Sequence, residues 1–389
     1  MLAAQPGAGG SGPSAASGGS PAGTGGVGAS GAVQGSGEAG SGGALSLVGS
    51  GGQAGSSGEG SAGASTAVLD PPAAALSVTP DTGIWSSVRG QQNPPVLTFQ
   101  INNAGATALR VDAVDVVDSD LFAITNAPPL PVTIAAGASV PVSVQLITAL
   151  NALPAPPPQD SGSTVAAGAL SITAGAVSAR ARLHGIILTQ AIWEPTFGQV
   201  LDALGHDVNI GNTLRTNANP DTMPGVEAGT DEIDAPLFVR AGPGDVSLKP
   251  VARFSPVGVM PFGFYTPGDA NARTEVGAMD EQDDPHTSNK ARLLLPPVTG
   301  STSFDPGPGP FGVWAFTNQL AEGNPQNGNH LFTEDALNAT GGPHRIKVYP
   351  LADAAGTAIA SSYLLACEEA ANGDYQDYVF ILSNVTVAP

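Results

Sequence analysis

The sequence predicts an all-β fold, in which a disordered Gly/Ser/Ala-rich stalk precedes two β-sandwich domains. Two observations predict this fold class. From residue 67 onward, short runs rich in Val, Leu, Ile and Thr alternate apolar with polar side chains, as half-buried strands do. Gly, Pro, Asn and Asp separate these runs at short intervals, which is the pattern of antiparallel sandwiches.

Residues 1–66 are expected to form a flexible linker. They consist almost wholly of Gly, Ser and Ala, so they cannot bury enough apolar surface to offset their conformational entropy. A Gly-rich coil of this length has a root-mean-square span of about 45 Å. We expect it to hold the folded domains away from a surface, and a tail without a role is the alternative.

Residues 67–185 predict an immunoglobulin-like sandwich. The expected strands are short, and turn-forming residues separate them. Residues 149–167 are rich in Pro and are expected to form a long loop. The expected strands are Leu76–Val78, Val96–Ile101, Leu109–Val117, Asp120–Ile124, Pro131–Ile134, Val140–Leu146, Leu170–Ile172 and Val177–Leu183.

Two short patterns make this region more specific. Asn103-Ala104-Gly105 leads to Leu109 as an N-x-G turn, and an A-x-G-x-S-V segment follows at residues 135–140. With the order of the strands, these patterns make residues 75–185 resemble the immunoglobulin-type modules of the abnormal-spindle/hydin group. Bacterial surface proteins carry such modules as choice-of-anchor D domains. The resemblance implies a spacer or scaffold rather than an enzyme.

Residues 186–389 predict a second sandwich, jelly-roll-like, with one short helix. The helix is expected from Thr196 as N-cap to Leu204, with Gly205 after its end. Residues 186–234 belong either to this domain or to a connector before it. The expected strands are Ala235–Arg240, Ser247–Phe254, Val257–Tyr265, Phe311–Thr317, His330–Thr333, Arg345–Tyr349, Ser362–Glu368 and Tyr378–Val385.

An acidic segment opens the last expected strand. It reads GDYQDYVF from Gly373 to Phe380, with Glu368 upstream and the Glu334-Asp335 pair before that. Residues 235–389 thereby resemble, loosely, the C-terminal β-sandwich domains of bacterial extracellular proteins in the DUF4114-like group. The resemblance implies a secreted module with a Ca²⁺ site.

The residues of this segment themselves favour a cation site. Glu368 ends one expected strand, and Asp374 and Asp377 flank the turn into the next strand. Neighbouring strand ends lie side by side, so these carboxylates should crowd one loop. Crowded carboxylates repel one another, and Ca²⁺ takes six to eight oxygen ligands. We expect Ca²⁺ at Asp374, Asp377 and Glu368, with Glu334 or Asp335 as further ligands; a solvated acidic turn is the alternative.

A second acidic run, Asp280-Glu281-Gln282-Asp283-Asp284, is expected to be a solvated loop, or alternatively a weaker cation site. The aromatic side chains are few. Trp85, Trp193 and Trp314 could stack on sugar rings if they were exposed, but the apolar neighbours of Trp314 favour packing in the core.

Composition excludes several other classes of site. The formal net charge is −20, from 13 Lys and Arg against 33 Asp and Glu, which disfavours binding to nucleic acids and to anionic lipids. A single cysteine, Cys367, rules out an intramolecular disulfide. The sequence contains no apolar run long enough for a transmembrane helix. It also contains no zinc-type histidine spacing, nucleophile elbow or P-loop.

These observations predict a non-enzymatic bacterial protein, secreted or tethered to the cell surface, with a structural or adhesive role. Its expected partner is a component of the cell envelope or the extracellular medium, with a glycan as one candidate. Because no signal peptide is visible at Met1, we expect an export signal or lipid anchor upstream of it. A tethered carbohydrate-binding module is the alternative function, and a hydrolase with a site in residues 186–389 is a third hypothesis.

Overall fold

The computed structural model describes residues 75–90, 94–148, 163–189, 194–216, 229–256, 258–279, 290–317, 330–338, 344–369 and 373–389. The chain divides into two units, residues 1–67 and 68–389. The predicted linker, residues 1–66, therefore lies outside the described residues, and so do the acidic run at residues 280–284 and Trp193.

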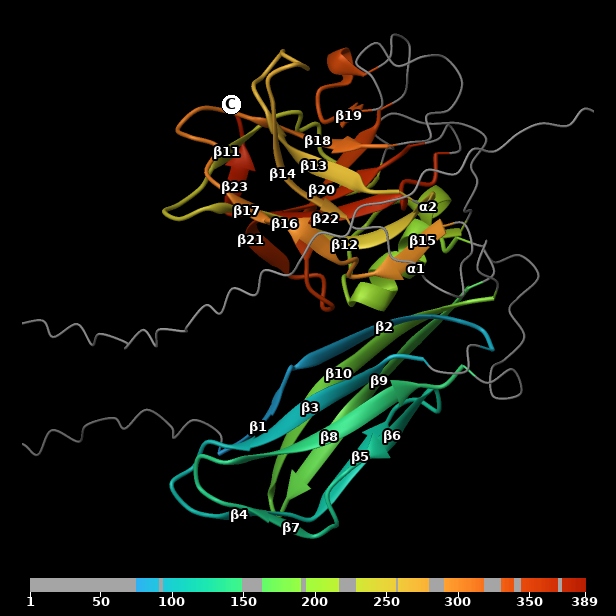
Figure 1. Ribbon diagram of the computed structural model, residues 1–389, viewed down its shortest axis with the longest axis vertical. Helices are drawn as coiled ribbons and strands as arrows, with labels where there is room; N and C mark the ends of the chain where they lie inside the picture. The colour runs from blue at the N-terminus through green and yellow to red at the C-terminus, as the bar shows by residue number, and fades with distance from the viewer. Residues whose placement is uncertain are drawn as a thin grey trace, which may run out of the picture. The chain divides into compact units, whose positions relative to one another are not determined.

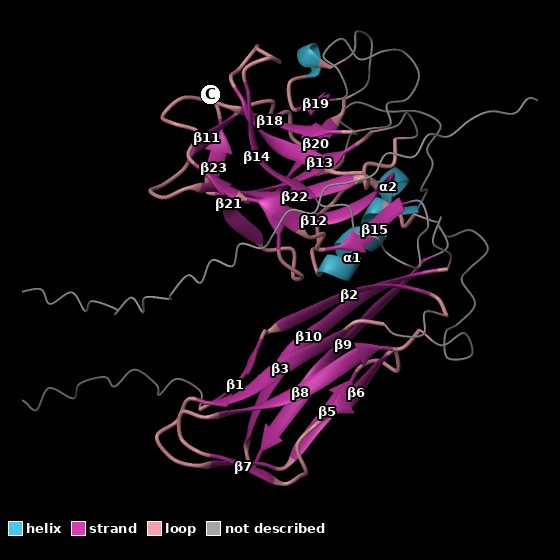
Figure 2. Ribbon diagram, in the orientation of Figure 1, coloured by secondary structure: helices cyan, strands magenta, loops and turns pink. Residues whose placement is uncertain are grey.

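The regular secondary structure of the described residues is nearly all β, as predicted (Figure 2). A first sandwich contains two four-stranded sheets, with the orders β1-β3-β8-β6 and β2-β10-β9-β5 (Figure 1). A small two-stranded sheet joins β4 to β7. The bounds are β1 Leu76–Thr79, β2 Thr82–Val88, β3 Val96–Asn103, β4 Leu109–Val111, β5 Ala113–Val117, β6 Phe122–Asn126, β7 Val132–Ile134, β8 Ser139–Leu146, β9 Ser163–Ala174 and β10 Val177–Leu188.

The core of this sandwich forms between the two sheets, where every second side chain of a strand faces inward. Trp85 of β2 packs on Phe99 of β3 and Phe122 of β6. Asn103 is a buried polar exception: its side-chain amide donates to the carbonyls of Thr107, Ile134 and Ala135, and its Oδ1 accepts from the N–H of Gly105. The N-x-G turn is therefore fixed by one buried asparagine.

Three expectations for this sandwich need correction. Residues Thr82–Val88 form β2, which pairs in parallel with β10 and was not expected. The expected strand Leu109–Val117 is divided at Asp112 into β4 and β5, which join different sheets. The end of the expected loop, residues 163–167, belongs to β9. Its residues, which include Val165 and Ala166, pair with β10.

The second sandwich is jelly-roll-like and packs a sheet of order β15-β12-β22-β21-β20, with β17 beside β12, on a sheet of order β16-β14-β13-β18-β19. A short pair, β11-β23, completes it. The bounds are β11 Phe238–Arg240, β12 Val246–Pro256, β13 Met260–Tyr265, β14 Arg273–Met279, β15 Lys290–Leu294, β16 Val298–Gly300, β17 Ser303–Phe304, β18 Gly312–Phe316, β19 His330–Phe332, β20 Ile346–Ala352, β21 Ala358–Cys367, β22 Tyr378–Ser383 and β23 Val385–Val387.

The predicted helix is α1, Phe197–Leu204. The Thr196 side chain accepts from the N–H of Gln199, and the Gln199 side chain accepts from the N–H of Thr196, which is a capping box. Gly205 ends the helix with a φ of 77°, the left-handed conformation that glycine adopts without strain. A shorter helix, α2 (Asn212–Thr216), and a 3₁₀ turn, η1 (Asp335–Leu337), lie elsewhere in the chain. None of the described helices is long and apolar enough to cross a membrane.

Candidate metal centre

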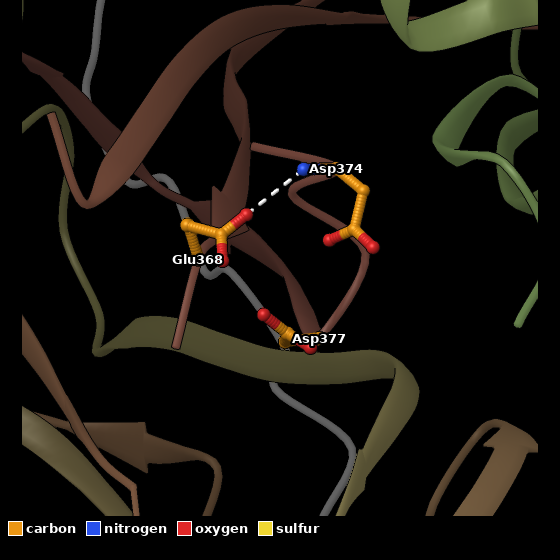
Figure 3. Close-up of side chains that lie close together, drawn as sticks. All are labelled: Glu368, Asp374 and Asp377. Carbon is orange, nitrogen blue, oxygen red and sulfur yellow. Dashed lines mark hydrogen bonds between the residues drawn. The ribbon is translucent and has the colours of Figure 1, made fainter. Parts of the chain in front are cut away.

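The predicted acidic turn lies at one end of the β21–β22 hairpin. Cys367, the last residue of β21, pairs with Tyr378, the first residue of β22, so Glu368 and Asp377 directly follow and precede paired positions. Asp374 lies in the connection between them. Figure 3 shows the three carboxyl groups gathered around one space. The predicted crowding of Glu368, Asp374 and Asp377 is therefore present in the structure.

The spacing of these carboxylates suits a single cation bound by all three. One ligand oxygen from each residue lies within 4.8 Å of the other two, and all three residues are buried. Ca²⁺ binds oxygens at 2.3–2.6 Å, so two oxygens on opposite sides of the ion are about 5 Å apart. The separation of the three carboxylates is within this limit.

Backbone hydrogen bonds hold two of the three carboxylates in place. Oε2 of Glu368 accepts from the N–H groups of Asp374 (2.9 Å) and Tyr375 (3.3 Å). Oδ2 of Asp377 accepts from the N–H of Glu369 (2.7 Å). Tyr375 has a φ of 56°, a left-handed conformation that turns the chain back toward Glu368. The turn thus supplies both the acidic groups and the donors that orient them.

Gln376 adds a neutral oxygen to this cluster. Its side chain is fully buried, and its Nε2 donates to Oδ2 of Asp374 (2.8 Å) and, at 3.4 Å, to Oε2 of Glu194. Its Oε1 accepts no hydrogen bond from any residue that the structure describes. A buried amide oxygen without a donor is costly, and amide oxygens are ordinary Ca²⁺ ligands.

Four residues that surround the turn were not predicted from the sequence. Gln376 was detectable, because it lies inside the acidic segment itself. Glu194, Arg292 and Arg345 were not, because they come from distant parts of the chain. Arg292 contacts Glu194 through Nη2, while its Nε and Nη1 have no hydrogen-bond partner among the described residues. Nη1 of Arg345 donates to the backbone carbonyl of Glu368 at 3.3 Å.

Glu369, adjacent to Glu368, is also buried in this region. Its Oε2 accepts from the hydroxyl groups of Thr317 (2.7 Å) and Tyr378 (2.6 Å). Two donors on one oxygen hold this carboxylate within the C-terminal sandwich, and its charge acts on the same cluster.

Burial makes the ionised forms of these acids unfavourable. Desolvation, and then the charge of Glu368, raises the pKa of Asp374 from 3.8 to about 8. Desolvation raises the pKa of Glu369 from 4.5 to about 7, although its two hydroxyl donors oppose the shift. The pKa of Asp377 is also well above its usual range, through burial and then the charge of Glu369. A bound cation would favour the ionised forms of Asp374, Glu369 and Asp377.

The two nearby arginines do not remove this cost. Burial lowers the pKa values of Arg292 and Arg345, even though carboxylates surround both guanidinium groups. The pKa values of the acids stay raised in their presence. Carboxylate and amide oxygens form a hard donor set, which fits Ca²⁺ and does not fit a thiolate- or imidazole-preferring metal.

The other two predicted ligands, Glu334 and Asp335, form hydrogen bonds outside the cluster. Oε2 of Glu334 accepts from the N–H of Gly268 at 2.9 Å. The carboxylate of Asp335 contacts Nδ1 of His344 at 2.8 and 2.9 Å. Neither belongs to the group of three carboxylates that converge at the hairpin. The candidate ligands are therefore Glu368, Asp374, Asp377 and Gln376.

The described tryptophans do not form an exposed platform for sugar rings. Trp85 and Trp314 are 1% and 4% exposed. The indole N–H of Trp314 donates to backbone carbonyls of Phe264 and Thr274, and Arg273 lies over its ring. These side chains are packed in the core, as the sequence favoured.

Comparison with known proteins finds no matching family model and no matching curated protein. Similar solved structures include the VesB protease of Vibrio cholerae, 18% identical over 30% of this chain and 32% of that chain, with a TM-score of 0.21. The YadV chaperone is 12% identical over 63% of this chain and 94% of that chain, with a TM-score of 0.20. The secreted serine protease VesC of Vibrio cholerae is 13% identical, with a TM-score of 0.20, over 78% of this chain and 49% of that chain. The chain thus spans about a third of VesB and half of VesC.

Proposed function

We propose that this chain is a non-enzymatic structural or adhesive protein, secreted or tethered to the cell surface, whose C-terminal sandwich is stabilised by Ca²⁺. The observation that carries the proposal is the convergence of three buried carboxylates, Glu368, Asp374 and Asp377, within 4.8 Å. A second, independent observation is that Oε1 of Gln376, beside Asp374, accepts no hydrogen bond from the described residues.

Burial of the site supports a structural rather than a catalytic role. Glu368, Asp374 and Asp377 are 0%, 2% and 4% exposed, so a substrate would not reach them. Their hairpin, β21–β22, lies inside the six-stranded sheet. A cation there would join the ends of two central strands, and the stability it adds would be shared by the whole sheet.

The location and the partner are part of the same proposal. The Gly/Ser/Ala stalk and the two family resemblances support a protein held at, or released from, a cell surface. Extracellular Ca²⁺ modules commonly have dissociation constants of about 10⁻⁴–10⁻³ M, which suit a site that is permanently filled outside the cell. A cell-envelope or extracellular component, including a glycan, is the proposed partner.

Thermal unfolding of the full chain in Ca²⁺ and in EDTA tests the proposal. A ligand that binds only the native state stabilises it by about 2.7 kcal/mol at a hundredfold excess over Kd. With a Kd of about 10⁻⁴–10⁻³ M, 10 mM Ca²⁺ is a tenfold to hundredfold excess, so we expect a rise of about 1.4–2.7 kcal/mol. The rise should be lost in the double variant Asp374→Ala, Asp377→Ala. Glu334→Ala is the matched control, because Glu334 lies outside the cluster, and it should retain the full response. No shift at millimolar Ca²⁺ would reduce the site to a buried acidic turn.

A further inference from the structure

A second buried cluster of charged groups lies in the C-terminal sandwich. Nζ of Lys347, in β20, is 2.5 Å from Oε2 of Glu232, and the two side chains are 1% and 0% exposed. The two residues are 115 positions apart in the chain. Ile233, next to Glu232, bridges the backbone of Val348. The backbone therefore fixes the amine and the carboxyl group in contact.

The other oxygen of Glu232 faces a histidine. Oε1 of Glu232 accepts no hydrogen bond from the described residues and lies 3.5 Å from Nε2 of His344. Nδ1 of the same ring contacts the Asp335 carboxylate at 2.8 Å. Because a carboxylate accepts hydrogen bonds, this contact places a proton on Nδ1 and directs Nε2 toward Glu232. A carboxylate that orients an imidazole in this way is the arrangement of many acid–base catalysts.

The surroundings of the pair exclude water. Nζ of Lys347 lies 4.9 Å from the centre of the Tyr375 ring, and the Tyr375 hydroxyl donates to the backbone carbonyl of His344 at 2.6 Å. Removing two charges from water is costly, so this burial favours any step that neutralises the pair. Holding two reacting groups in contact also raises their effective concentration to about 10⁵ M or more.

We propose that Lys347 and Glu232 become joined by an intramolecular isopeptide bond. The Lys347 ammonium first passes one proton to the Glu232 carboxylate, which leaves a neutral amine and a carboxylic acid. The amine nitrogen attacks Cδ of Glu232, and the N–C bond forms. The surplus proton on nitrogen passes through the His344 ring to Oε1, and the carboxyl hydroxyl proton follows it to the same oxygen. The C–Oε1 bond then breaks, one water molecule leaves, and Oε2 becomes the amide carbonyl oxygen. No oxidant or other reactant is needed, and an ion pair becomes a neutral amide.

Such a bond would give this chain an internal covalent link of a kind that its single cysteine cannot provide. Cys367 is alone in the sequence and buried, so no internal disulfide can form. An amide between residues 232 and 347 would close most of the second sandwich into a loop that denaturant and reductant leave intact. This inference does not depend on Ca²⁺, because neither residue is among the candidate ligands.

Intact mass spectrometry of the folded full chain tests the proposal. We expect a mass lower than the sequence mass by one water molecule, and a proteolytic fragment in which Lys347 and Glu232 are linked. A folded wild-type chain that keeps its full sequence mass after prolonged incubation would overturn the proposal. A loss of water that persists in Glu232→Ala would also overturn it.

Four variants separate bond formation from folding. Glu232→Gln keeps the shape of the side chain and should lose ammonia in place of water, so it should reach the same final mass as the wild type. Glu232→Ala and Lys347→Met should keep their full masses. His344→Gln should fold but convert more slowly, measured as the fraction of linked chain against time. Conversion of His344→Gln at the wild-type rate would remove His344 from the reaction.

Discussion

Replacing Asp374 by asparagine should stabilise the chain without Ca²⁺, and most of this gain should disappear with Ca²⁺. The substitution removes the ionisable group and keeps the shape of the side chain. Oδ2 of Asp374 accepts from Nε2 of Gln376 at 2.8 Å, and the asparagine carbonyl can accept the same hydrogen bond. The packing around this buried turn should therefore survive the change.

The magnitude follows from the pKa of Asp374. Its value is about 8 in the folded chain against 3.8 ordinarily, so between these pH values the native state binds a proton that the unfolded state lacks. Stability due to this group is therefore present below pH 3.8 and is lost as the pH rises toward 8. At pH 7 the loss is roughly 4 kcal/mol. Asparagine does not titrate, so the metal-free variant should be more stable than the wild type by about 2–4 kcal/mol, since neighbouring acids share the effect.

With Ca²⁺ present most of this advantage should disappear, because the variant lacks a charged ligand and forfeits about 2.7 kcal/mol of stabilisation at a hundredfold excess over Kd. Urea unfolding at pH 7, in EDTA and in millimolar Ca²⁺, measures both differences. Asp269→Asn is the matched control, because Asp269 lies on an exposed turn where its Oδ1 accepts from the N–H of Asn271. An equal change in stability by Asp374→Asn in EDTA and in Ca²⁺, whether a gain or a loss, would refute the reasoning.

Three further predictions concern the same chain. In EDTA the unfolding free energy should fall as the pH rises from 5 to 8, because Glu369 and Asp374 have raised pKa values of about 7 and about 8; Ca²⁺ should flatten this dependence, and a flat profile in EDTA would contradict the electrostatics. Thr196→Ala should cost about 1 kcal/mol by removing the N-cap of α1, measured by urea unfolding, whereas Thr196→Ser should restore most of the loss. Asn103→Ala should destabilise the first sandwich by roughly 3 kcal/mol, because three backbone carbonyls, that of Ile134 in a buried hydrogen bond, lose their donor; a loss below 1 kcal/mol in the same assay would show that water replaces the amide.

The sequence predicted those features that depend on nearby residues. Thr196 was predicted as the N-cap of α1, and the structure adds the reciprocal hydrogen bond with the side chain of Gln199, three positions later. The convergence of Glu368, Asp374 and Asp377 follows from one hairpin, because paired strand ends must lie together. Alternation also placed most strands, since an inward-facing apolar side chain recurs at every second position.

Features that join distant segments were not predictable in the same way. Strand β2 pairs in parallel with β10, about a hundred residues later in the chain, and its sequence TGIWSSV has polar residues that weaken a strand pattern. Glu194, which precedes α1 and lies in no strand, accepts a hydrogen bond from the side chain of Gln376. Glu232 and Lys347 are also far apart in sequence. No local period marks such pairs, because only the assembled fold brings them together.

The electrostatics of the hairpin explain why a cation, rather than the two arginines, should compensate the acids. Arg292 and Arg345 are close enough to act on Asp377, yet the pKa of Asp377 remains well above its usual range. A guanidinium group carries one charge and is itself destabilised by burial, as the lowered pKa values of both arginines show. A divalent ion carries twice the charge and lies within about 2.6 Å of each ligand oxygen. Because Coulomb energy scales with charge and inversely with distance, the ion is the stronger counter-charge for these acids.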